Sequence, residues 1–384
     1  MIRPRMLVTI VFQRGQSSGY RGTTKMNFKH ADTLFRAEKL NELCSSADGI
    51  KFLRLRSLSR SKYLTELLET CGIDATSIKA KDILSTAFAQ SLDIPTIDKF
   101  IKSKYDKERS VRKEKEEELF NELYKLKVFH WGGLHQNSLE KTIVDNYIKK
   151  ISSYDLIEKK IETDLQSSLR GYVLCSWYNH WTSILIEDVF KDHKRVLPAL
   201  GLIPKIDFFI DDIPYDLKVT YLPEGFIADK RRNAGVRPEL TLLKRSARNL
   251  GIPIDGDISG SAQLENLWTK HTEFKSIAAQ NLTADLKKFR MDVIEEIEGD
   301  PGELMKWLYE NQGIRRFDAS NRFFIVLVNT NNFFEGWKMK RALPQLREAT
   351  REYLDKSRSV GRDVSFEWER STYQAKGDVL LIRN

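Results

Sequence analysis

The hydrophobic pattern of this chain changes its period near residue 196, and the change limits the folds that the chain can adopt. Before that point, apolar residues recur every three or four positions, as they do along one face of a helix. After it come three short runs rich in β-forming residues and bounded by Pro, Gly and an Asp-Asp pair; they span 196–202, 205–210 and 213–222. Such runs are typical of consecutive antiparallel strands. The pattern therefore predicts a fold that combines helices with a sheet.

The rest of the sequence supplies further elements of both kinds. A strongly apolar helix is expected over 172–191, directly before the first strand. Helical periodicity returns at 238–249, 264–298, 301–311 and 336–356, and further strands are expected at 322–328, 365–369 and 378–382. The predicted fold class is therefore α/β, with helices flanking a mixed sheet of at least four strands.

The chain divides into three regions by composition. Residues 1–25 are expected to be a flexible leader, because a Gly/Ser/Arg-rich stretch ends just before Met26, where translation could also begin. Residues 26–150 form a basic helical region, and residues 151–384 form a second domain with a helical insertion at about 229–311. A hydrophobic content of 41% is enough to build a packed core and excludes a disordered chain.

The excess of positive charge lies in the first of these regions. The formal net charge is +9; residues 1–150 hold 28 basic and 19 acidic residues, whereas residues 151–384 hold 35 of each. A polyanionic partner would thus be attracted chiefly by the N-terminal part. Three cysteines without a CxxC pair suggest neither a disulfide framework nor a cysteine-based zinc site, and no run is long enough to cross a bilayer. We expect a cytoplasmic protein without a membrane partner.

Two segments of the helical region bear on how it contacts a partner. Residues 87–101 have the pattern of a helix, a tight turn and a second helix, which fits a helix-turn-helix DNA reader or a packed helical hairpin. The second helix has few base-reading side chains, which favours the hairpin. Residues 102–127 are dense in Lys, Arg and Glu, which predicts a solvated helix or a connector.

One acid-x-Lys motif has the context that a catalytic site needs. The bare pattern occurs five times, beginning at Glu158, Asp192, Asp216, Glu273 and Asp285. Four of these lie in or beside helical stretches, where residues two apart point to different sides. Only Asp216 and Lys218 fall in a predicted strand, where residues two apart share a face.

The preceding strand brings a second acid to this motif. If Asp211-Asp212 is a two-residue turn, Asp207 lies opposite Asp216 on one face of the sheet. Two carboxylates that close repel each other, and a divalent cation would relieve the repulsion. Mg²⁺ prefers carboxylate oxygens and keeps positions open for water and phosphate. Lys218, on the same face, could orient or help to deprotonate an attacking water.

These residues resemble the motif of the PD-(D/E)XK nucleases, which have the restriction-endonuclease-like fold. The resemblance rests on Pro204-Lys205-Ile206-Asp207 and on Asp216-Leu217-Lys218-Val219-Thr220 of the next strand. It implies an α-β-β-β-α-β core in residues 151–384. It also implies that Asp207 and Asp216 bind Mg²⁺ and that Lys218 serves the hydrolytic water. Glu187 occupies the position where many members place a further acid on the helix before the first strand.

The resemblance carries expectations about activity and partners. It implies an endonuclease that cuts double-stranded DNA with Mg²⁺, or with Mn²⁺ as a substitute, most closely a type II restriction or phage-defence enzyme. It also implies a homodimer and a cognate DNA methyltransferase in the same system. The basic residues 26–150 would recognise or position the DNA. Three alternatives stay open: a non-catalytic DNA-binding protein on a degenerate nuclease scaffold, a repair or junction-resolving nuclease, and a nuclease that cuts RNA.

A basic segment follows the motif. Residues 229–248 have a local charge of +5, and their cations could contact phosphate or line a solvated helix face. The candidate DNA-binding residues are Lys230, Arg231, Arg232, Arg237, Lys244, Arg245 and Arg248.

Overall fold

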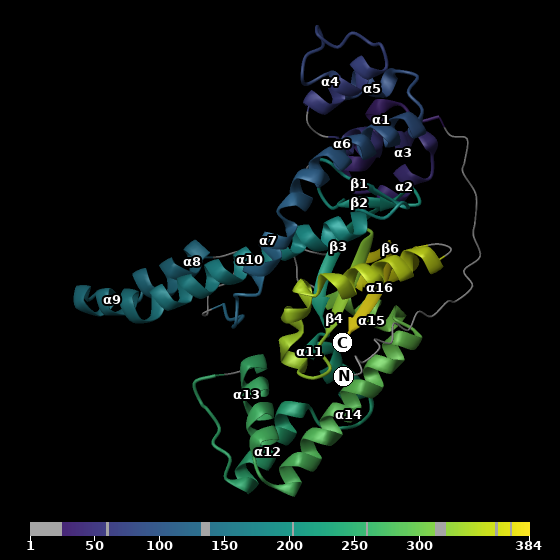
Figure 1. The fold of residues 1–384 in the computed structure, drawn as a ribbon. Helices are drawn as coiled ribbons and strands as arrows, with labels where there is room; N and C mark the ends of the chain where they lie inside the picture. The colour runs from purple at the N-terminus through teal and green to yellow at the C-terminus, as the bar shows by residue number, and fades with distance from the viewer. Residues whose placement is uncertain are drawn as a thin grey trace.

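A central sheet is flanked on several sides by helical units (Figure 1). The computed structural model describes residues 25–58, 61–131, 139–201, 203–258, 260–311, 320–357, 360–368 and 371–384. The expected leader therefore lies outside the described residues except for Lys25. Helices α1–α6 lie at one end of the molecule, α12 and α13 lie at the other end, and α8, α9 and part of α10 project as an arm.

The sheet is mixed and has six strands in the order β1-β2-β3-β4-β6-β5. The strands are β1 (Val196–Pro198), β2 (Phe208–Ile210), β3 (Ile213–Tyr221), β4 (Arg322–Val328), β5 (Arg362–Trp368) and β6 (Ser371–Arg383). The pairs β1–β2, β2–β3 and β5–β6 are antiparallel, whereas β3–β4 and β4–β6 are parallel. The predicted α/β class with a mixed sheet is confirmed; the strand predicted over 322–328 is present with both ends as predicted, and the other five are present with at least one end shifted.

All seven residues of strand β4 are buried. One face, with Phe323 and Ile325, packs in a cluster with α10 and α16, whereas Phe324 and Val326 face α14 and α15. This is the burial expected of a parallel strand covered on both faces, and it explains the unbroken apolar run. The covering helices are α10 (Gln166–Lys191), η4 (Phe333–Arg341) and α16 (Leu343–Lys356) on the first face, and α11 (Glu224–Asn233), α14 (Ile277–Gly299) and α15 (Gly302–Asn311) on the second.

The N-terminal helices share their core with the first two strands. They are α1 (Phe28–Arg36), α2 (Leu40–Cys44), α3 (Ala47–Ser57), α4 (Ser61–Thr70), α5 (Ile83–Ala89), α6 (Ile94–Glu114) and α7 (Glu116–Leu123). Leu197 of β1 and Phe209 of β2 belong to their apolar clusters. The buried guanidinium of Arg54 lies 3.9 Å from the Phe209 ring centroid and pairs with Asp98 and Asp212 at 3.0 and 2.9 Å. The helical hairpin predicted over 87–101 is present as α5 and α6.

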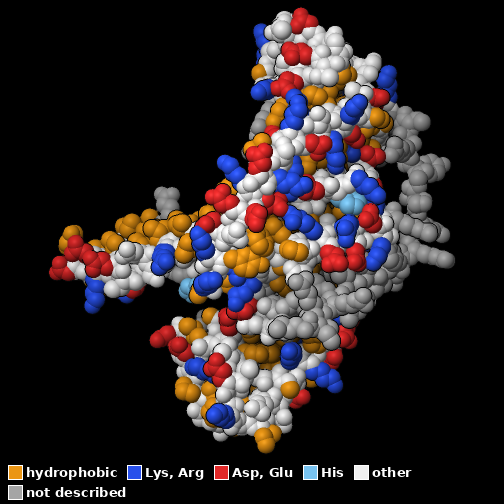
Figure 2. All heavy atoms as spheres, viewed as in Figure 1, with side chains coloured by type: hydrophobic (Ala, Val, Ile, Leu, Met, Phe, Trp, Pro, Cys, Tyr) orange, Lys and Arg blue, Asp and Glu red, His pale blue; other side chains and the backbone are white. Residues whose placement is uncertain are grey.

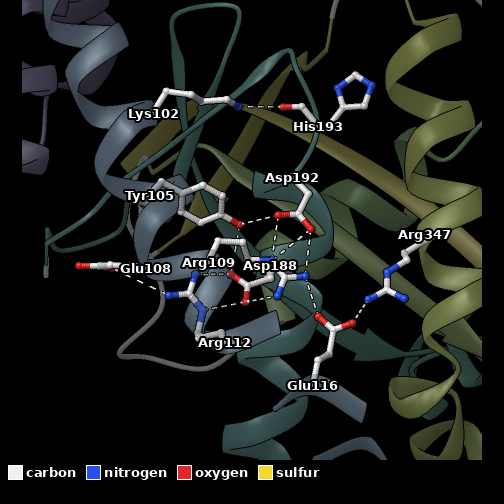
Figure 3. Close-up of polar contacts among 10 residues, drawn as sticks. All are labelled: Lys102, Tyr105, Glu108, Arg109, Arg112, Glu116, Asp188, Asp192, His193 and Arg347. Atoms are coloured by element: carbon white, nitrogen blue, oxygen red, sulfur yellow. Dashed lines mark hydrogen bonds and ion pairs between the residues drawn. The ribbon is translucent and has the colours of Figure 1, made fainter. Parts of the chain in front are cut away.

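An ionic network joins α6 to the C-terminal half of α10 (Figure 3). The buried guanidinium of Arg109 contacts Asp192 at 2.9 Å and Glu116 at 2.6 Å, and lies 3.7 Å from Asp188. Arg112 pairs with the same Asp188 at 2.8 Å. Charges that are this deeply buried require partners, so the network fixes where α6 lies on α10.

The segment 102–127, expected as a solvated helix or a connector, is helical over most of its length, and only four of its residues are buried. It differs from a single solvated helix in that α6 ends at Glu114 and α7 begins at Glu116. The side of α6 that carries Tyr105 and Arg109 is also buried. Arg109 and Arg112 pair with Asp192 and Asp188, some 80 positions later in the chain, and local composition cannot show such pairs.

Two predicted helices are each divided. The helix expected over 264–298 is α13 (Gly260–Glu273) followed by α14, because the backbone is extended at Ser276. The helix expected over 336–356 is η4 followed by α16, which begins with Pro344 in its first turn. Proline lacks an N–H and clashes with the preceding turn, so the helix must start anew there. Apolar periodicity continues across both breaks and hides them.

The remaining helices form the arm and complete the insertion. The arm contains α8 (Leu139–Ile143), η1 (Val144–Ile148), α9 (Tyr154–Lys160) and η2 (Ile161–Leu165), and the insertion contains α12 (Glu239–Leu250). In the described ranges, no helix combines the length and the apolar character needed to span a membrane.

Candidate active site

The hairpin of β2 and β3 positions the acid-x-Lys motif. Its register pairs Phe208 with Tyr215 and Ile210 with Ile213, so the loop contains only Asp211-Asp212. Both loop residues have positive φ, at 50° and 70°. This backbone matches the twist of the flanking strands, and Asp tolerates it better than most residues. The two-residue turn predicted from the sequence is confirmed.

Asp207 lies just before β2 and turns its side chain toward β3. Its N–H donates to the carbonyl of Tyr215 at 2.8 Å, although Tyr215 already faces Phe208. Two residues thus oppose one, as in a β-bulge, which re-aims a side chain. One carboxylate oxygen of Asp207 accepts the N–H of Leu217 at 2.7 Å. Asp207 therefore contacts the backbone of the motif itself rather than standing directly opposite Asp216 in the strand ladder.

The environment of Asp207 disfavours its charge. Burial, and to a smaller extent the negative charges of Glu187 and Asp216, together raise the pKa of this carboxyl group to about 6, against the lowering effect of the Leu217 N–H. The charges of Glu187 and Asp216 thus both act on the Asp207 carboxyl group.

Asp216 and Lys218 form an ion pair on β3. The ammonium of Lys218 lies 2.6 Å from one carboxylate oxygen of Asp216, as their shared face predicts. The other oxygen is 3.9 Å from the guanidinium of Arg322, the first residue of β4, which pairs with Asp216 in the parallel register. Asp216 is buried, whereas the side chain of Lys218 is about one-third exposed. One end of the pair is thus fixed in the fold, and the other can reach solvent.

Glu187 approaches the acids from the last turns of α10. Its carboxylate pairs with Lys191 one turn later, at 2.8 Å. A hollow beside Lys191 is lined mainly by cations of α6, namely Lys102, Arg109 and Lys113, with Ser110 and the acids Asp106 and Asp192 between them. A basic surface therefore borders the acidic cluster.

The donor set suits a hard divalent cation. Carboxylate oxygens are the ligands that Mg²⁺ prefers, and Asp207, Asp216 and Glu187 would supply them. In the described part of the chain, no three His, Cys, Asp or Glu side chains are arranged as a ready-made metal site. Two of the three acids are instead neutralised by Lys218 and Lys191. A cation would therefore have to displace these ammonium groups.

Several proposed DNA-binding residues are already engaged in the fold. Lys230 pairs with Glu296 at 2.5 Å and with Glu303 at 2.8 Å. Arg231 is buried and donates to the carbonyl of Arg237. Arg232 pairs with Asp229, whereas Arg237, Arg245 and Arg248 are exposed and Lys244 is half-buried. Lys244, Arg245 and Arg248 lie on α12 and Arg237 lies just before it, so the segment presents its remaining exposed positive charge on and beside this helix.

Sequence reasoning missed two cations of the site. Arg322 opens an apolar strand and reaches Asp216 only because β4 lies parallel to β3. Lys191 stands one helical turn after Glu187, a spacing at which side chains meet, and this signal was present in the sequence.

Comparisons with family models, with curated proteins and with solved structures found no match for this chain.

Proposed function

We propose that this chain is a Mg²⁺-dependent endonuclease that hydrolyses phosphodiester bonds of double-stranded DNA, on a fold related to the PD-(D/E)XK nucleases. The observation that carries the proposal is the crowding of acids at Asp207, whose pKa is raised to about 6 by burial and by Glu187 and Asp216. Such crowding costs stability unless a cation neutralises it. Titratable groups whose pKa is strongly shifted concentrate at functional sites.

Each residue of the cluster has a role in this proposal. Asp207 and Asp216 would hold the cation, with Glu187 at its side, and Arg322 helps to orient the Asp216 carboxylate. A bound Mg²⁺ would polarise the phosphate and lower the pKa of a water. Lys218, once released from Asp216 and in its neutral form, would orient that water and accept its proton as the water oxygen bonds to phosphorus. The P–O bond opposite the water would break, and the leaving sugar oxygen would take up a proton from solvent.

A DNA substrate is supported by the cations around the site. The hollow lined by Lys102, Lys113 and Lys191 is joined to Glu187 through the Lys191–Glu187 ion pair, and residues 1–150 hold the whole charge excess of the chain. Phosphate contacts of this kind supply affinity without sequence preference. The proposed setting is a restriction or phage-defence system, with a methyltransferase protecting the host DNA.

The experiment is a substrate panel. The purified chain is incubated with plasmid and phage DNA, with methylated and unmethylated copies, with a branched duplex and with RNA, in Mg²⁺, Mn²⁺ or EDTA. The proposal expects metal-dependent fragments from duplex DNA that disappear in EDTA and with Lys218→Met. Cleavage of RNA alone, or of branched duplex alone, would show that this molecule is the substrate in place of ordinary duplex DNA. Binding without cleavage in either metal would instead favour a non-catalytic DNA-binding protein.

A further inference from the structure

The helical arm projects from the body of the molecule, and none of its residues whose exposure the structure describes is buried. It contains α8, η1, α9, η2 and the first part of α10, and it extends sideways beyond the sheet (Figure 1). Among the residues between Leu139 and Leu174 whose exposure the structure describes, none is buried; on α10 the first buried side chain is Cys175. The arm therefore has no apolar core of its own.

Large apolar side chains nevertheless gather on this arm. Figure 2 shows hydrophobic side chains along it. Six of them have exposed fractions from 41% at Leu169 to 72% at Tyr154: Ile148, Tyr154, Leu156, Ile161, Leu169 and Val173. Single exposed apolar residues are common on protein surfaces, but a concentration on one projecting element marks an interaction surface.

The charge of the arm selects among the surfaces that could cover it. Residues 139–174 contain six acidic and six basic residues, so the arm has no net charge. A nucleic acid or an anionic membrane would require an excess of cations. A surface that pairs with a copy of itself must instead have no large excess of one sign, because both copies present the same patch and like charges would repel.

The size of the arm fits the same partner. A stable interface uses roughly 20–30 residues from each partner. The arm offers the 36 positions from Leu139 to Leu174. Helices of this kind associate side by side through their apolar stripes.

We propose that the arm is a homodimerisation surface, on which the apolar residues of α9 and α10 pack against the same residues of a second copy of this chain. Because α10 also holds Glu187 at its other end, the association would fix the orientation of the two candidate sites through one continuous helix. The proposal rests on burial and charge and does not depend on the nuclease activity.

The test is the mass of the full-length chain in solution, measured by light scattering and by sedimentation equilibrium. The wild type is expected at twice the 44.6 kDa of one chain. The double variant Leu169→Glu/Val173→Glu places charge on one side of α10 and should weaken association at least about 100-fold. Ile277→Glu, a change at an apolar residue that is 77% exposed on α14, is the matched control and should remain dimeric.

A second measurement separates dissociation from misfolding. The melting temperature of the wild type should rise with protein concentration, whereas that of a folded monomeric variant should not. Helical circular dichroism reports whether the variant is folded, and Leu169→Ser/Val173→Ser provides a milder form of the same change. A wild type that is monomeric at high micromolar concentration would overturn the proposal. So would a folded Glu variant that dimerises as tightly as the wild type, or a monomer that floats with phosphatidylcholine vesicles.

Discussion

Asp207 holds its negative charge at a cost. Burial and the neighbouring acids raise the pKa of its carboxyl group to about 6 in the folded chain, against 3.8 for an unperturbed Asp. The folded state therefore keeps this proton where the unfolded state has lost it. The stability linked to this group is fully present below about pH 4 and is lost as the pH rises toward 6.

The first prediction follows from the direction of this pKa shift. In EDTA at pH 8, Asp207→Asn should raise the free energy of unfolding by up to about 3 kcal/mol, because the charge is removed while the side-chain oxygen can still accept the Leu217 N–H. At pH 4 the gain should vanish. Urea denaturation at both pH values measures it. Asp285→Asn, at an exposed acid of α14, should change stability equally little at both pH values, and a gain for Asp207→Asn that is independent of pH would refute the electrostatic explanation.

At the scale of single residues, the sequence located the motif through its strand context. Of the five acid-x-Lys matches, only Asp216 and Lys218 lie in a predicted strand. The structure places these two side chains in contact. The sequence did not foresee that Asp207 leaves the ladder, because a bulge depends on backbone hydrogen bonds between strands. It could not place Arg322 either, since the contact requires the parallel pairing of β3 with β4.

Among the elements, α6 and α10 depend on each other most strongly. Arg109 is 4% exposed and holds Asp192 and Glu116. Arg109→Ala would remove the cation that pairs with Asp192 and one of the two cations beside each of Asp188 and Glu116, which should lower the free energy of unfolding by about 3–5 kcal/mol. Chemical denaturation measures the loss. Arg36→Ala, which breaks an exposed pair with Asp32, should change it by less than about 1 kcal/mol, and equal effects of the two variants would contradict the structural role.

Helices α11 and α12 give a prediction about DNA. Arg245 is exposed on α12 and forms no ion pair with another described residue, whereas Lys230 is held by Glu296 and Glu303. In Ca²⁺, Arg245→Ala should weaken duplex binding and reduce its salt dependence by about one counterion. Lys230→Ala should leave both nearly unchanged. Fluorescence anisotropy over a range of salt concentrations distinguishes the variants. A larger loss of duplex binding for Lys230→Ala than for Arg245→Ala would show that the DNA does not contact α12.

Element boundaries were less predictable than element types. The helices over 264–298 and 336–356 were expected as single segments, but the chain breaks at Ser276 and before Pro344. The buried side of α6 was also missed, because its charged residues are satisfied only by the acids of α10. In both cases the deciding contacts join segments far apart in the sequence.

On the scale of the whole molecule, the charge excess and the acids occupy neighbouring regions. The basic N-terminal helices share apolar clusters with β1 and β2, and one of these clusters contains Ile206, the neighbour of Asp207. Under the proposed function, a polyanion bound to these helices would lie near Asp207. The net charge of +9 alone predicts a polyanionic partner without saying where it binds.

The most direct measurement is the rate of duplex DNA cleavage in Mg²⁺ by two matched variants. Asp216→Asn alters the acid of the proposed site, whereas Asp285→Asn alters the same acid-x-Lys pattern on the exposed side of α14. We expect Asp216→Asn to slow cleavage at least about 100-fold, since it removes a negative ligand from the proposed metal site. Asp285→Asn should cleave at the wild-type rate. Equal rates for Asp216→Asn and the wild type would contradict the assignment of the active site.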